Sequence, residues 1–116
     1  MTALSAQDLL NAERVTTLAR VAALTAEFDD IVAGTDAGSS DDEHDPEGST
    51  IAFERARVST LVSQGRAYLD ELEQAQGRIA NGTYGVCEHC GAAIPRERLV
   101  ALPTARTCVH CRPTAV

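Results

Sequence analysis

The sequence lacks several residue types on which large folds and membrane proteins depend. It has no Trp and no Lys, two Phe and two Tyr, and no apolar run near the roughly 20 residues that cross a bilayer. Its first residues show no basic segment followed by an apolar one, so we expect no signal peptide and a cytoplasmic location. A chain of 116 residues holds one small domain, with or without an extension, which excludes a two-domain enzyme.

Small and acidic side chains are plentiful instead. Ala occurs 19 times, which suits close packing of helices better than a broad globular core. The formal net charge is −7, and residues 36–50 contribute six acids without a base. A field of this sign does not favour binding to the phosphate backbone of a nucleic acid.

Helical periodicity flanks this acidic segment on both sides. Hydrophobic and other seam residues recur at heptad spacing in two sets, Leu10, Arg14, Thr17, Val21, Leu24, Phe28 and Ile31, then Ile51, Val58, Leu61, Gly65, Tyr68, Leu72, Ala75 and Ile79. Ser5 predicts a start for the first helix, and Ser49 or Thr50 can cap the second. Asn81 and Gly82 mark its end.

Two amphipathic helices joined by a polar connection most simply form an antiparallel hairpin. We therefore predict an all-α fold, with a two-helix coiled-coil hairpin over residues 1–83 and a separate module over residues 84–116. The seam contains many small residues and buries little apolar area, so the hairpin needs a clamp at its open end. From composition alone, residues 36–50 are a solvated linker.

The predicted clamp contains all four cysteines, Cys87, Cys90, Cys108 and Cys111, as two Cys-x2-Cys pairs separated by seventeen residues. Each pair can offer two thiolates to one ion, so the spacing predicts one structural Zn²⁺ bound by four cysteines. A dithiol redox pair or four free thiols is the alternative. His89 and His110 lie between paired cysteines, and with four thiolates present they are expected to be exposed polar residues.

The charge of the finger bears on nucleic-acid binding. Four thiolates with Zn²⁺ contribute a charge of −2, which roughly cancels the net positive charge of the four arginines and two acids of this module. Sequence-specific DNA binding is therefore not expected, although a local basic face could form from Arg96, Arg98, Arg106 and Arg112. Ile94, Leu99, Val100 and Leu102 are expected to pack within the finger and against the helix ends.

The order of these parts resembles the DksA/TraR zinc-finger family of bacterial transcription regulators. The resemblance is most specific at Tyr84-Gly-Val-Cys87-Glu-His-Cys90-Gly91 and over residues 94–111. A second match lies in the acidic segment, where Asp42-Glu43-His44-Asp45 resembles the Asp-x-x-Asp pair at the family's coiled-coil tip, with Phe53-Glu54 following at the family's distance. Glu47 stands at the position where the family commonly has Ala.

The resemblance implies a function. Family members bind RNA polymerase directly, insert the hairpin into its secondary channel and alter initiation, and some act with ppGpp. It therefore implies an effector tip formed by Asp42 and Asp45. Only five residues follow Cys111, too few for the longer C-terminal helix of some relatives, so ppGpp dependence is supported less than polymerase binding.

Two other functions stay open on the sequence. One is a coiled-coil adaptor whose zinc finger is purely structural, and the other is a thiol or zinc redox switch. An enzyme is not expected, because no nucleophile has a base partner in sequence context and no Gly-rich phosphate loop occurs.

Overall fold

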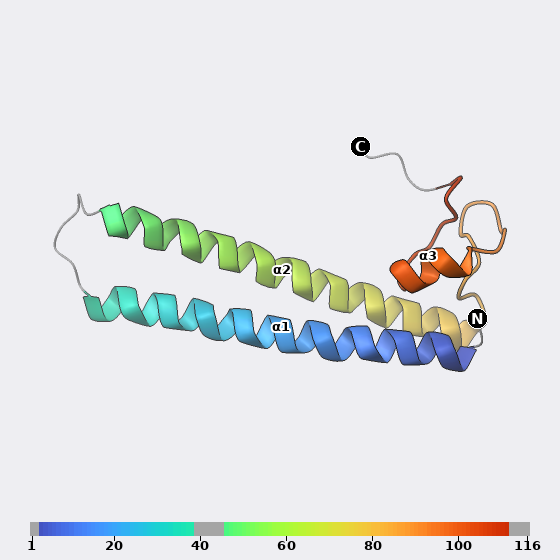
Figure 1. Ribbon diagram of the computed structural model, residues 1–116, viewed down its shortest axis with the longest axis horizontal. Helices are drawn as coiled ribbons and strands as arrows, with labels where there is room; N and C mark the ends of the chain where they lie inside the picture. Colours follow the sequence, from blue (N-terminus) through green and yellow to red (C-terminus); the bar gives the residue numbers. More distant parts are fainter. Residues whose placement is uncertain (1–2, 39–45, 112–116) are drawn as a thin grey trace. The chain divides into compact units, whose positions relative to one another are not determined.

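The structure is a computed structural model that describes residues 3–38 and 46–111. It contains three helices in this range, α1 (Ala3–Gly38), α2 (Pro46–Asn81) and α3 (Arg96–Ala101), as drawn in Figure 1. An isolated antiparallel bridge joins Val86 to Ala93. The predicted all-α fold, a two-helix hairpin followed by a four-cysteine finger, is confirmed. Over these described ranges, no helix is both long and apolar enough to cross a membrane.

The chain divides into two compact units, and each long helix contributes to both. The finger unit comprises, among the described residues, 3–15 and 69–111; the hairpin unit comprises 16–38 and 46–68. Within each unit, α1 and α2 run antiparallel. The predicted boundary between a hairpin of residues 1–83 and a finger module of residues 84–116 stays a prediction.

In the finger unit, the start of α1 packs on the end of α2. Leu10 from α1 and Leu72 and Ala75 from α2 are almost fully buried, as the heptad pattern predicts. Beside them, the Gln76 amide donates to Asn11 at 3.3 Å, and Gln7 donates to both Asn11 and Gln76. A polar cluster at a two-helix seam favours one register over others, because a shifted pairing would separate the partners.

In the hairpin unit, the seam residues that are buried are small or of medium size. Thr17, Val58 and Gly65 are buried, and six further predicted seam residues are half-buried: Val21, Leu24, Phe28, Ile31, Leu61 and Tyr68. At the surface of this unit, Arg57 bonds Glu54 at 2.9 Å and lies 3.4 Å from Glu27 on α1. The predicted seam is therefore confirmed, although Ile51 is 36% exposed and Arg14, in the finger unit, is exposed.

The helix starts differ from the predicted ones. α1 begins at Ala3, so Ser5 lies inside the helix instead of capping it. α2 begins at Pro46, before Ser49 and Thr50. Proline suits the first helical position because its φ is already helical and the N–H that it lacks would have no intrahelical acceptor there. The predicted end of α2 is confirmed, since the helix stops at Asn81 and Gly82 follows with φ +77°.

Candidate metal centre

The first cysteine pair lies in a tight turn after α2. The Gly91 N–H donates to Cys87 O at 2.9 Å, and the Cys90 N–H points at Cys87 Sγ at 3.5 Å. Gly85 and Gly91, on either side of the pair, have φ of +82° and +77°, a region that other residues enter at a cost. The Cys87 N–H bonds Ala92 O at 2.8 Å and closes the turn.

The second pair forms a matching turn and is joined to the first through the backbone. The Cys111 N–H donates to Cys108 O at 3.1 Å. The N–H of Glu88, inside the first pair, donates to Arg106 O at 2.8 Å, just before the second pair. This bond brings together two turns that are far apart in sequence.

The four sulfur atoms of Cys87, Cys90, Cys108 and Cys111 all lie within 4.8 Å of one another. Cys90 Sγ and Cys108 Sγ are 3.8 Å apart, and all four residues are free cysteines. Four sulfurs bound at about 2.3 Å to a tetrahedral Zn²⁺ lie about 3.8 Å from each other. The donor set and its spacing therefore fit a four-thiolate zinc ion.

The thiols of this cluster do not ionise alike. The pKa of Cys87 is lowered to about 6, chiefly because the Cys90 N–H donates to its sulfur. The pKa of Cys111 is raised to about 12, because hydrogen bonds with the side chains of Cys90 and then Cys108 favour its protonated form. Neighbouring thiolates repel one another, and a bound cation offsets this repulsion.

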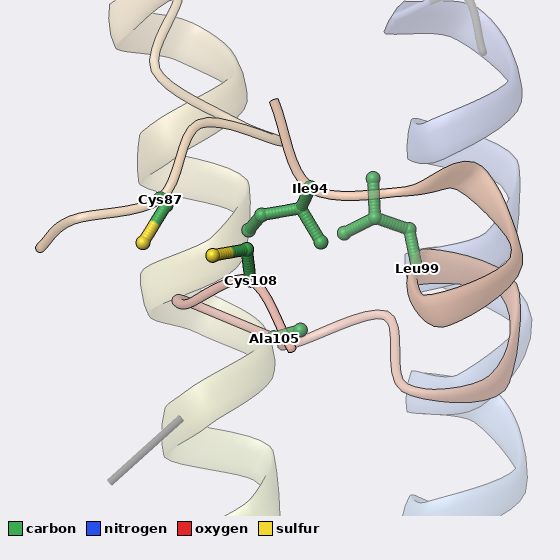
Figure 2. Packing of buried hydrophobic residues seen from close by; sticks show 5 residues of the cluster. All are labelled: Cys87, Ile94, Leu99, Ala105 and Cys108. Atoms are coloured by element: carbon green, nitrogen blue, oxygen red, sulfur yellow. The ribbon is translucent and has the colours of Figure 1, made fainter. Parts of the chain in front are cut away.

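An apolar core supports the cluster. Cys87, Ile94, Leu99, Ala105 and Cys108 are each at most 5% exposed and lie together, as Figure 2 shows. Burial of this core keeps one side of the cysteine turns away from water.

Two of the residues predicted to pack there do not. Val100 is 52% exposed and Leu102 is 40% exposed. On the short helix α3, the face that carries Leu99 covers the core, so the next residue points outward.

The polar residues of the finger are placed as follows. His89 and His110 are exposed, as predicted, and the metal-ligating group that the structure brings together consists of cysteines. Arg98 donates to Thr107 O at 2.9 Å, and Arg106 bonds Gln74 and lies 4.0 Å from Glu88. These two arginines therefore have partners within the finger unit, while Arg112 lies outside the described residues.

The predicted tip pair lies outside the described residues as well. Asp42 and Asp45 fall in the gap between residue 38, where α1 ends, and residue 46, where α2 begins. Their assignment as the effector tip stays a prediction.

Two further residues hold the finger together, and the sequence did not predict them. Tyr84 donates to Pro103 O at 2.8 Å, and Arg78 of α2 donates to Thr104 O at 3.3 Å. Their partners are 19 and 26 residues away, so no local pattern indicates them. The only available signal was the place of Tyr84 in the quoted motif around Cys87.

The structure thus combines a four-cysteine finger with a two-helix hairpin. Proteins of this class are known, and this chain is similar to several of them. Residues 82–114 match the prokaryotic dksA/traR C4-type zinc finger family. The resemblance to the DksA/TraR family, predicted from the sequence, is thereby confirmed.

Curated proteins match longer parts of the chain. The uncharacterized protein YteA of Bacillus subtilis is 44% identical over 69 residues, which are 60% of this chain and 29% of YteA. The RNA polymerase-binding transcription factor DksA of Escherichia coli is 34% identical over 50 residues, 43% of this chain and 33% of DksA. This chain spans half or less of the length of such curated relatives.

A solved structure shares the fold. The transcription factor DksA2 from Pseudomonas aeruginosa superimposes with a TM-score of 0.80, over 95% of this chain and 79% of that one. The two sequences are 24% identical, so the likeness is one of architecture.

Proposed function

We propose that this protein binds RNA polymerase directly and regulates the initiation of transcription. The observation that carries the proposal is the DksA/TraR finger over residues 82–114, attached to a hairpin with the DksA2 fold. A relative that is 34% identical over 50 residues is named for RNA polymerase binding, which supports the same partner. The protein would act in the cytoplasm, where the polymerase works, as a regulator and not as an enzyme.

In this proposal, Cys87, Cys90, Cys108 and Cys111 bind one Zn²⁺. The sulfur positions support it, since all four atoms lie within 4.8 Å of one another. When bound, the ion supplies folding energy to a small module, and four protein ligands leave no open position for a substrate. The role assigned to the zinc is therefore structural.

Asp42 and Asp45 are proposed as the effector tip that enters the secondary channel of the polymerase. The connection between α1 and α2 has seven residues, 39–45, and joins antiparallel helices of the hairpin unit. Carboxylates three residues apart in such a connection can act together on cationic side chains or a Mg²⁺-bound network. They would act there on the active centre of another protein.

The test is transcription in vitro with purified polymerase, comparing the wild type with Asp45→Asn. We expect the variant to bind core polymerase as the wild type does, measured by co-purification, and to lose the change in transcript yield. Asp30→Asn is the matched control, because Asp30 is exposed on α1 and undergoes the same loss of charge.

The outcomes separate the parts of the proposal. A wild type that does not bind polymerase removes the function altogether. An Asp45→Asn variant that binds and regulates like the wild type removes the tip assignment alone.

A further inference from the structure

The segment of residues 103–107 leads directly into the second cysteine pair. It follows α3 and belongs to no helix or strand. Pro103, Thr104 and Ala105 are nevertheless buried. Irregular backbone that is buried must find partners for its carbonyl groups, because an unpaired buried carbonyl costs about as much as a lost hydrogen bond.

Side chains from three separate places in the finger unit supply these partners. Tyr84 Oη donates to Pro103 O at 2.8 Å. Arg78 Nη2, from the last turn of α2, donates to Thr104 O at 3.3 Å. Arg98 Nε, from α3, donates to Thr107 O at 2.9 Å. We call Arg78, Tyr84 and Arg98 the carbonyl clamp.

Each cysteine turn has a backbone bond of its own, but the chain that leads into the two pairs is held differently. The first pair is closed by backbone bonds of its own neighbourhood, from the Cys87 N–H to Ala92 O and from the Gly91 N–H to Cys87 O. The approach to Cys108 depends on donors that are 9 to 26 residues away in sequence. A loss of these donors should therefore affect the second pair and leave the first in place.

We propose that the carbonyl clamp consists of positioning residues that pre-set Cys108 and Cys111 for metal binding. The inference rests on the zinc site of the proposed function and assigns these three side chains a role in holding the ion. A ligand that is fixed before binding loses less freedom when the metal arrives. The clamp would therefore slow the release of zinc by keeping two of its four ligands from moving apart.

The experiment uses the zinc-loaded full chain and four variants. Tyr84→Phe, Arg78→Gln and Arg98→Gln each remove one donor of the clamp. Arg96→Gln is the matched control, because Arg96 is an exposed arginine of α3 that donates to none of the carbonyls described above. Each protein is treated with N-ethylmaleimide, and labelling of the two cysteine pairs is compared after trypsin cleavage at Arg106, which separates them.

We expect each clamp variant to label faster at Cys108 and Cys111, with labelling at Cys87 and Cys90 unchanged at early times. Zinc affinity, measured by competition with a chromophoric chelator, should fall about tenfold, the lower end of what residues supporting metal ligands contribute. Arg96→Gln should match the wild type in both measurements.

Three outcomes would overturn the inference. If labelling rises equally at all four cysteines, the variants have lost structure generally and the clamp has no specific effect on the second pair. Tyr84→Phe removes only one hydroxyl, so it is the variant least expected to misfold. Labelling and affinity like those of the wild type show that the clamp does not position the ligands. A wild type that binds neither zinc nor Co²⁺ removes the zinc site itself, and the inference falls with it.

Discussion

Gly65 lies so close to Val21 that a Cβ atom on the glycine would come within 2.5 Å of Val21 Cγ2. This approach occurs in the seam of the hairpin unit, where Gly65 of α2 is buried and Val21 of α1 is half-buried. Glycine is a poor helix former, and here its lack of a side chain lets the two helices meet. The valine cannot easily turn away, since a β-branched side chain in a helix has one strongly preferred rotamer.

Gly65→Ala should therefore destabilise the protein. An Ala gains about 1 kcal/mol of helix propensity, but overpacking a tight contact costs about 1–3 kcal/mol. We expect a net loss of about 1 kcal/mol in the free energy of unfolding, measured by urea denaturation. The double variant Gly65→Ala/Val21→Ala should lose less free energy of unfolding than the sum of the losses of the two single variants. Additive effects in this double-mutant cycle would show that the contact does not limit packing.

Two valines allow a matched test of the seam. Val58 is fully buried in the hairpin unit, whereas Val15 is 68% exposed in the finger unit. Val58→Ala should lower the free energy of unfolding by about 2 kcal/mol, because it removes two buried methyl groups. Val15→Ala should change it by less than about 0.5 kcal/mol. Equal losses at the two sites would mean that Val15 is covered by another surface, such as a second copy of the chain.

Zinc content should depend on the cysteines and not on the histidines between them. Cys108→Ser should abolish stoichiometric binding, measured by metal analysis and by the charge-transfer band of the Co²⁺ form. His110→Gln is the control and should bind as the wild type does, because His110 is exposed. Affinity should fall as the pH is lowered, since protons compete with the ion for the thiolates. Retention of one zinc per chain in Cys108→Ser would assign a ligand outside this set.

The acidic connection can be tested against the adaptor alternative. Replacement of residues 41–47 by a Gly/Ser segment of equal length should abolish the effect on transcription, because it removes Asp42 and Asp45 together. Binding to the polymerase should persist, and circular dichroism should show helix content close to that of the wild type. Full regulation by this variant would favour an adaptor whose helix faces make the contacts.

Much of the fold could be predicted because its signals are local. Leu10, Val58 and Leu72 are buried where the heptad spacing places them, since a helix brings residues of one stripe to one face whatever lies around it. The helix starts were less predictable. Ser5, Ser49 and Thr50 all have the chemistry of a cap, but Pro46 at the start of α2 fits the first helical turn, and the helix begins there.

The candidate site divides in the same way. The two Cys-x2-Cys pairs could be predicted from the sequence, because each is a short turn that places two thiols together. Packing around them was harder to predict, as the exposure of Val100 and Leu102 shows. Their neighbour Leu99 is buried, and a sequence of mixed apolar residues in a six-residue helix does not reveal which one faces the core.

The sequence by itself determined the helical seams, the end of α2 and the two Cys-x2-Cys turns, because each depends on residues that are near each other along the chain. Only the tertiary structure decided the close approach of Gly65 to Val21 and the bonds from Arg78 and Tyr84 to the segment before Cys108. These contacts join residues 19 to 44 positions apart, and such pairs exist only once the elements that carry them have packed.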